Sequence, residues 1–347
     1  MNRFIETKIL PYLPNIAIRF FIQILFIYNL YILKKYNGPR EEKQKVINII
    51  ENNRNNAKIA LSINNDNSNS SVFELIYGAN RFTACGHNIK IYKTLTAVET
   101  ANIAVIEDKL NLSELENGAN ILDLECSWGG VLLHYAFKYP DLNFIGYSKF
   151  PECVEYITKV NVCKNLKIFQ RGIHEGIDDT IKYDRIISID DINTFGDYET
   201  YFQIISENLK DDGFLYLQTI THRENTIAIN KTNMFSYFFT GNGDYVIPSI
   251  NLFYQFQDDL NITNMECIPG IYRANMVNMW LGNLERNRDT IIAMFLKDKE
   301  YVYEQWRLIY LIISECLSSN NGREFTSTSY IMMKYQMEEK PEPCDEP

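Results

Sequence analysis

The sequence has no pair of cysteines in Cys-x-x-Cys spacing and no excess of basic residues. Its seven cysteines are isolated along the chain, which excludes a zinc framework and a secreted disulfide scaffold, so no metal site is expected. Reduced, mostly buried thiols remain as the expectation, and they indicate an intracellular, reducing compartment, the mitochondrion included. The net charge of −10 argues against nucleic acid as a partner, because nucleic-acid binding needs a basic footprint.

Apolar residues are plentiful by contrast. Hydrophobic residues make up 46% and aromatic residues 13% of the 347 residues, which is enough to fill a sizeable core and excludes global disorder. The length suits one large domain or two modest ones. The charge by itself names no partner.

The longest apolar stretch is short and interrupted. Residues 16–33 read IAIRFFIQILFIYNLYIL, with Arg19, Gln23 and Asn29 inside the run, and no small-residue cleavage site accompanies it, so a secretory signal fits poorly. Two interpretations stay open for this N-terminal segment (residues 1–40). It forms a helix that packs on the domain or lies on a membrane surface, or it spans a bilayer.

Periodicity predicts an α/β core. Short apolar strands alternate with segments of helical spacing, which is typical of right-handed crossovers and a mainly parallel, Rossmann-like sheet with helices on both faces. The predicted strands are residues 119–124, 143–148, 166–169, 184–189, 213–220 and, last, 328–334, with a turn at 210–213; the predicted helices are residues 128–139 and 151–162.

The rest of the chain surrounds this core. A helical cap with an Asn/Ser-rich loop is predicted for residues 41–110, and the core itself for residues 111–225. A helical and aromatic insertion on the substrate side precedes the last strand within residues 226–337. An acidic disordered tail is predicted for residues 338–347.

Several motifs, in order along the chain, resemble one family. They are residues 121–130 (ILDLECSWGG), 183–189 (YDRIISI), 237–241 with 248–249 (YFFTG…PS), 280–285 (WLGNLE) and 306–325 (WRLIYLIISECLSSNNGREF). Together they resemble the coclaurine N-methyltransferase and cyclopropane fatty acid synthase family of S-adenosylmethionine-dependent methyltransferases. The resemblance covers about residues 8–335 and implies a class I methyltransferase fold with an N-terminal helical cap.

The resemblance also implies where S-adenosylmethionine would bind, and several of those positions have changed. The first two glycines of the Gly-x-Gly-x-Gly turn are Glu125 and Ser127 here, although glycine suits such a turn because it has no Cβ and tolerates positive φ. A Gln and an Asp that hold the adenosine half correspond to Cys153 and Gly172. The implied, degenerate cofactor site consists of Asp123, Glu125, Ser127, Trp128, Gly129, Ser148, Cys153 and Gly172. We therefore expect no tight binding of the cofactor.

The family's reacting groups have changed as well. In the N-methyltransferase branch a Glu–His pair follows the fourth strand, and Asn193 and Thr194 stand at those two positions. Neither side chain titrates near neutral pH, so neither can act as a general base. The positions that hold bicarbonate in the cyclopropane branch correspond to Ala84, Asn193, Gln218 and Arg273.

Two functions follow from these motifs. The changed positions favour a non-catalytic, methyltransferase-like protein, acting as a binding module or as an accessory subunit beside other proteins of a larger assembly. The alternative is an active methyltransferase on a small amine or a lipid, which would use S-adenosylmethionine with Asp190, Asp191 or His222 as the polar partner.

Overall fold

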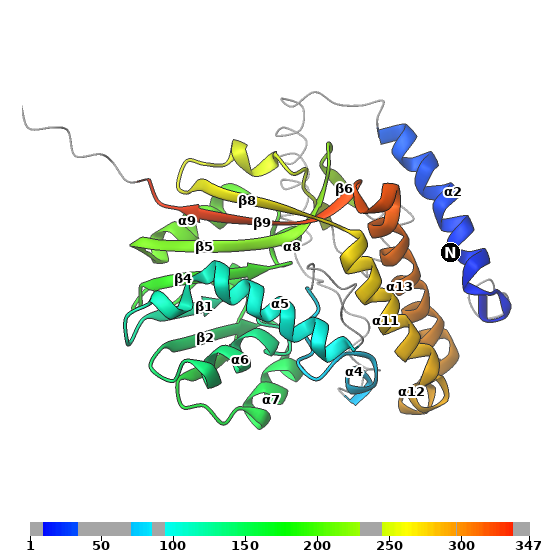
Figure 1. Cartoon of the computed structure of the whole chain (residues 1–347), viewed down its shortest axis with the longest axis horizontal. Helices are drawn as coiled ribbons and strands as arrows, with labels where there is room; N and C mark the ends of the chain where they lie inside the picture. Colours follow the sequence, from blue (N-terminus) through cyan, green and yellow to red (C-terminus); the bar gives the residue numbers. More distant parts are fainter. Residues whose placement is uncertain (1–9, 34–70, 85–93, 230–244, 296, 336–347) are drawn as a thin grey trace, which may run out of the picture.

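The computed structural model describes residues 10–33, 71–84, 94–229, 245–295 and 297–335 (Figure 1). The main strands are β1 (Asn120–Asp123), β2 (Asn143–Ser148), β3 (Leu166–Gln170), β4 (Tyr183–Ile189), β5 (Leu209–His222), β8 (Asn261–Pro269) and β9 (Phe325–Met333). They form one seven-stranded sheet in the order β3-β2-β1-β4-β5-β9-β8. The first five of these strands pair in parallel, and β9 and β8 pair antiparallel. The predicted Rossmann-like fold class is confirmed.

Two features of the sheet differ from the prediction. Residues 210–213 do not precede β5 but lie inside it, where pairing with β4 jumps from Leu209 opposite Tyr183 to Phe214 opposite Arg185. The extra residues form an irregularity in the strand rather than the predicted turn. Strand β8 was not predicted, because its sequence NITNMECIP has no clear alternation and it lies at the sheet edge with one neighbour, β9.

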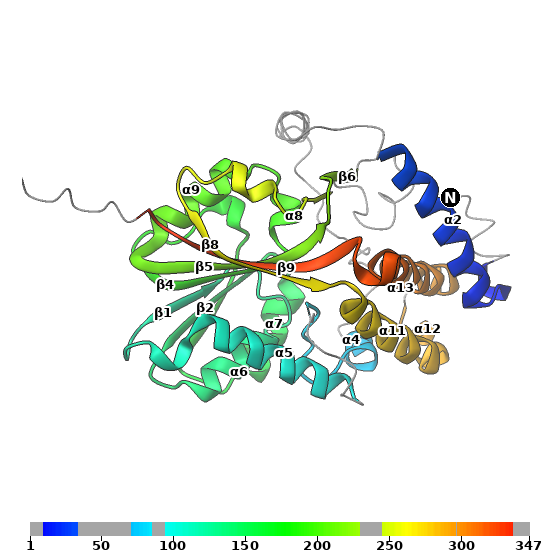
Figure 2. The same ribbon diagram turned by 45° about the horizontal axis from the view of Figure 1, so that its top comes forward.

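Helices cover both faces of the sheet (Figures 1 and 2). One face carries α5 (Leu95–Leu110) and α6 (Gly130–Lys138), and the other carries α9 (Tyr198–Asn208). Consecutive residues of β1 show the division, since Ile121 belongs to the hydrophobic cluster of the first face and Leu122 to that of the second. Burial on both faces explains why the predicted strands are continuous apolar runs.

Local sequence explains several helix ends. The Thr94 hydroxyl caps α5 by accepting the N–H of Ala97, and Asn111 ends that helix in the left-handed region. Helix α7 (Pro151–Val160) begins with proline in its first turn, as predicted. Gly129, with φ of +77°, precedes α6. The start of α6 therefore depends on a residue that tolerates positive φ.

A helical layer lies beyond one end of the sheet (Figures 1 and 2). It contains α2 (Asn15–Leu33), α4 (Ser71–Ile76), α11 (Ile271–Arg286), α12 (Arg288–Met294) and α13 (Lys299–Gly322), with the short α8 (Ile192–Phe195) and the hairpin of β6 (Ile227–Ile229) and β7 (Tyr245–Ile247) nearby. Helix α13 packs between α11 and α2. The helical and aromatic insertion predicted before the last strand contains α11, α12 and α13 together with the strands β6, β7 and β8.

The N-terminal helix packs on the domain. Ile18 and Ile22 of α2 are buried, and no helix in the described part of the chain is both long and apolar enough for a membrane span. The Asn/Ser-rich loop, residues 237–241 and the acidic tail lie outside the described residues. The predicted domain boundaries stay predictions.

Candidate functional site

The loop between β1 and α6 keeps the backbone shape of a glycine turn. Ser127, at the second glycine position, has φ of +49°, and Gly129 has φ of +77°. The turn closes through hydrogen bonds from the Cys126 amide to the Tyr147 carbonyl and from the Gly129 amide to the Cys126 carbonyl, both 2.8 Å. A non-glycine residue in the left-handed region costs about 1–2 kcal/mol. The tertiary structure therefore holds Ser127 in a conformation that its own side chain disfavours.

Glu125 reaches from this turn to the end of β2. Its carboxylate accepts the Ser148 hydroxyl at 2.8 Å and the Lys149 amide at 3.3 Å, and the Lys149 ammonium lies 3.9 Å away. The side chain is largely buried, and burial raises the pKa of Glu125. The extra side chain at the first glycine position thus bridges the carboxyl ends of β1 and β2.

Three carboxylates gather at this edge of the sheet, and we call Asp123, Glu125 and Asp191 the acidic cluster. Burial, together with the nearby charges of Glu125 and Asp191, raises the pKa of Asp123 to about 8, although the hydrogen bond from the Glu125 amide opposes the shift. Burial also raises the pKa of Asp191 to about 7, although the Lys149 ammonium 3.9 Å away opposes the shift. Asp123 and Asp191 are therefore expected to exchange protons near neutral pH.

Asp190 faces a different partner from Asp191. The Arg273 guanidinium, near the start of α11, holds both carboxylate oxygens of Asp190, with Nη1 3.1 Å from Oδ1 and Nη2 on Oδ2. Asp190 has φ of +59°, which turns it away from the line of β4. This bidentate pair links the sheet to the helical layer.

The side-chain amides of Asn193 and Gln218, at two positions where the resemblance implies reacting groups, each donate and accept a hydrogen bond. Asn193 is buried, donates its amide to the Val246 carbonyl at 2.8 Å and accepts the Thr219 hydroxyl. Gln218 donates to the Ala84 carbonyl at 2.6 Å and accepts the Tyr216 hydroxyl at 2.6 Å. Neither amide titrates near neutral pH, so these positions supply hydrogen bonds that fasten strands and loops together. The side chain of Thr194 lies outside the described residues.

His222 is hydrogen-bonded at the end of β5, with Glu324 and the residues that follow the strand. Its buried ring accepts the amide hydrogens of Glu224 and Asn225 at Nδ1, at 3.1 and 2.9 Å. Nε2 therefore carries the ring hydrogen and donates it to Glu324 at 3.2 Å. Both ring nitrogens therefore make hydrogen bonds that stabilise the end of β5, and this role is structural.

Trp128 belongs to a packed aromatic region, and Cys153 is buried on α7. The Trp128 ring lies 4.9 Å from Phe73 and 5.6 Å from Tyr156, and the Arg81 guanidinium stacks 3.9 Å from the centre of the Tyr156 ring. Cys153 is buried, and burial raises the pKa of its thiol above the usual range. The ring contacts indicate that Trp128 is mainly a packing residue, and Cys153 is a buried, neutral thiol.

Gly172 lies beside open space. A Cβ added there would meet nothing nearer than Lys149 Cβ at 3.9 Å. A larger polar side chain would therefore fit, and the contact that the resemblance implies at this position is missing for lack of a side chain. Sequence reasoning overlooked Lys149 and Arg81, although Lys149 follows directly on the Ser148 at the end of β2.

Comparisons with known proteins show the family of this chain. The family model described as mycolic acid cyclopropane synthetase matches residues 52–322. The chain belongs to the mycolic acid cyclopropane synthetase family. Among its relatives, (S)-coclaurine N-methyltransferase from Papaver somniferum is 24% identical over 254 residues, covering 69% of this chain and 71% of the relative. The S-adenosylmethionine-dependent methyltransferase UmaA from Mycobacterium tuberculosis is 27% identical, covering 67% and 84%.

Solved structures of the family share the fold. Coclaurine N-methyltransferase bound to N-methylheliamine and SAH has a TM-score of 0.80 at 24% identity and covers 96% of this chain and 97% of its own. Mycolic acid cyclopropane synthase CmaA1 complexed with SAH and CTAB has a TM-score of 0.63 at 21% identity, covering 77% and 94%. The chain is thus a member of a methyltransferase family with that family's fold.

Proposed function

We propose that this protein is a catalytically degenerate methyltransferase, which keeps the family scaffold as a binding module or accessory subunit. The observation that carries the proposal is Asn193. Its amide stands where the resemblance implies a glutamate, and both ends of the amide are bonded, to the Val246 carbonyl and the Thr219 hydroxyl. No proton acceptor with a pKa near neutrality stands at that position, so an amine bound there would not be deprotonated.

The cofactor positions support the same proposal. S-adenosylmethionine supplies an electrophilic methyl group when it is bound. In this chain the Glu125 carboxylate already accepts hydrogen bonds from the Ser148 hydroxyl and the Lys149 amide, so these two donors are not available to a cofactor. Cys153 and Gly172 offer no strong polar group to a ribose or an adenine. The residues present therefore fit the cofactor poorly, and we derive no reaction step through it.

Calorimetric titration with S-adenosylmethionine and S-adenosylhomocysteine tests the proposal directly. We expect weak binding or none to the full-length protein. The double variant Glu125→Gly/Ser127→Gly should bind more tightly, because it removes two side chains and one negative charge from the turn. A low-micromolar dissociation constant for the wild type would overturn the proposal. If the double variant folds but binds no more tightly than the wild type, the changes at Cys153 and Gly172 account for the weak binding instead.

An active methyltransferase is the second candidate, and the acidic cluster favours it. Burial brings the pKa of Asp191 to about 7, which suits a general base. Transfer of a labelled methyl group from S-adenosylmethionine to a secondary amine or to extracted lipids tests this candidate. Turnover that is lost in Asp191→Asn would establish it, and turnover that survives this substitution would assign the base elsewhere.

A further inference from the structure

Helix α2 is attached to the helical layer through polar side chains. The Arg19 guanidinium pairs with the Glu315 carboxylate and donates to the Asn278 amide oxygen at 2.7 Å, and Gln23 donates to the same Glu315 at 2.7 Å. These partners lie on α11 and α13, and Glu315 is largely buried. The inward face of α2 therefore carries the charged and polar residues of this part of the helix.

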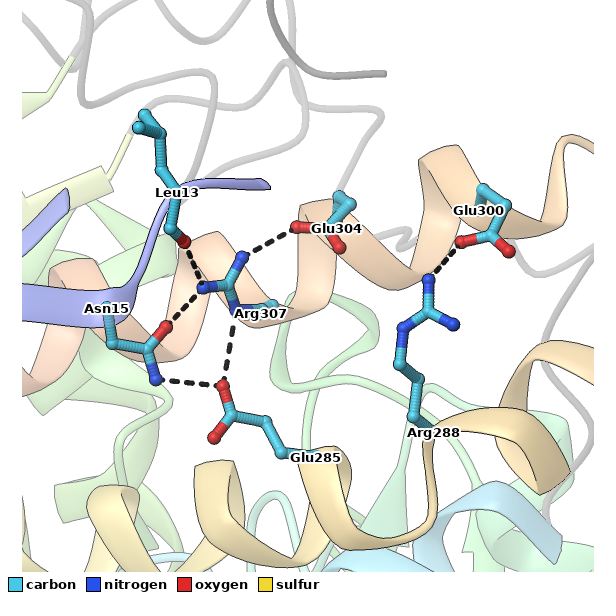
Figure 3. Close-up of polar contacts among 7 residues, drawn as sticks. All are labelled: Leu13, Asn15, Glu285, Arg288, Glu300, Glu304 and Arg307. Atoms are coloured by element: carbon cyan, nitrogen blue, oxygen red, sulfur yellow. Dashed lines mark hydrogen bonds and ion pairs between the residues drawn. The ribbon is translucent and has the colours of Figure 1, made fainter. Parts of the chain in front are cut away.

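A second polar network fixes the start of the helix (Figure 3). The Arg307 guanidinium donates to the Leu13 carbonyl at 3.0 Å and to the Asn15 side chain, and it pairs with Glu304 at 3.0 Å and Glu285 at 3.2 Å. Asn15 in turn donates to Glu285 at 2.8 Å. With anchors at its start and one turn further on, α2 cannot rotate about its axis, so its outward face is defined.

The outward face is an apolar stripe, formed by residues at a spacing of four. The side chains and their exposed fractions are Tyr12 at 83%, Ile16 at 77%, Phe20 at 62% and Ile24 at 48%, with Phe21 at 60% beside them. Four residues advance about 6 Å along a helix and return to nearly the same side, so Ile16, Phe20 and Ile24 run for roughly 12 Å along α2. Tyr12 lies just before the helix, in a short 3-10 turn (Leu10–Tyr12). We call these five residues the α2 stripe.

No charge interrupts the stripe. The sequence of α2 contains one charged residue, Arg19, and that residue points inward to Glu315. In Figures 1 and 2 the helix forms the outermost layer of the molecule beyond α13. An ordinary surface helix turns its apolar residues inward, whereas α2 buries Ile18 and Ile22 and also presents apolar side chains outward.

The size and shape of the α2 stripe decide whether it binds a second protein or a lipid bilayer. Five such side chains at these exposures present roughly 500 Å² of apolar surface, whereas a stable protein interface buries about 800 Å² on each partner. The stripe is also a ridge on a single helix, which offers no groove for a second helix. A bilayer surface needs neither the larger area nor the groove, because its acyl chains adapt to a ridge.

We infer that the α2 stripe docks this protein on a lipid bilayer, with the helix lying in the plane of the interface. The inference is independent of whether the methyltransferase site is active. Since the stripe is uncharged, binding should depend little on anionic lipid or on salt concentration.

Vesicles of zwitterionic phosphatidylcholine and the full-length protein provide the test. All three native tryptophans are buried, so a Phe20→Trp variant adds one exposed reporter to a background that should not respond. We expect its emission to shift to shorter wavelength with vesicles, and the protein to float with them at low and high salt. A Phe137→Trp variant is the matched control, because Phe137 is 77% exposed on α6. It should show no shift.

A second pair of variants tests the stripe itself. Ile16→Glu/Phe20→Glu should lower the vesicle partition coefficient at least tenfold, and Phe137→Glu should leave it unchanged. Both change exposed side chains, so both should fold. The inference is overturned if the wild type does not float, or if the double variant floats equally well. It is also overturned if the wild type is a dimer that the double variant converts to a monomer, since the stripe would then join two copies.

Discussion

Three buried carboxyl groups are expected to make the stability of the fold decrease as the pH rises. Burial raises the pKa of Asp123 to about 8 and those of Asp191 and Glu99 to about 7. The folded protein therefore keeps protons that the unfolded chain releases above about pH 4. Their contribution to stability is present at low pH and is lost as the pH rises through 7 and 8. Burial lowers the pKa of His134 and His174, which adds a smaller opposite slope below about pH 6.5.

Asp191→Asn is the variant that isolates this effect. At pH 8 it should stabilise the fold by about 1–3 kcal/mol, because a buried carboxylate that is mostly ionised becomes a neutral amide. The gain should shrink at pH 5, where wild-type Asp191 is already protonated. Urea denaturation at the two pH values measures the difference. Asp141→Asn, at an exposed position, is the control and should behave alike at both. An equal effect of Asp191→Asn at both pH values would contradict this account.

Helices α2, α11 and α13 depend on the Arg307 network more than on any surface ion pair near it. Arg307→Met leaves the buried Glu304 without its guanidinium partner and removes the bonds to Leu13 and Asn15. Loss of one member of a buried pair costs about 3–5 kcal/mol. We expect a fall of that size in the free energy of unfolding, and faster proteolysis within α2.

The matched control lies beside it in Figure 3. Arg288 pairs with Glu300 at 2.5 Å, and both side chains are exposed to solvent. Exposed pairs contribute about 0.2–1 kcal/mol, so Arg288→Met should change stability by no more than that. If the two variants lose equal stability, the buried network does not anchor the helix.

The described cysteines differ in how accessible their thiols are to solvent. Cys126, Cys153 and Cys316 are buried, and burial raises the pKa of Cys316 to about 12. Cys267 is exposed on the edge strand β8. An alkylating reagent should therefore modify Cys267 in the native protein and reach the three buried thiols only on unfolding, as peptide mass mapping would show. Rapid native modification of Cys153 would indicate that α7 opens readily from the sheet.

The sequence by itself determined the sheet and the places where a site could form. Continuous apolar runs predicted the five parallel strands, because strands buried on both faces leave that pattern, and a sixth strand was predicted at residues 328–334. The motif at residues 121–130 located the turn after β1 and contained the changed residues Glu125 and Ser127, and the segment after the fourth strand contained the changed residue Asn193. The polar interruptions Arg19, Gln23 and Asn29 left packing, a membrane surface and a membrane span open for the N-terminal helix, and in the structure Arg19 and Gln23 face α13.

Only the tertiary structure decided what those side chains contact. Strand β8 exists because β9 offers it a partner, and its own residues carry no strand pattern. Glu125 could have pointed into the turn or away from it, and the Ser148 hydroxyl and Lys149 amide of a different strand fixed its direction. Asp190 and Asp191 are neighbours in sequence, yet Arg273 and Lys149 separate them. The type and order of elements follow from local periodicity, but hydrogen-bond partners and pKa values depend on groups that only folding brings together.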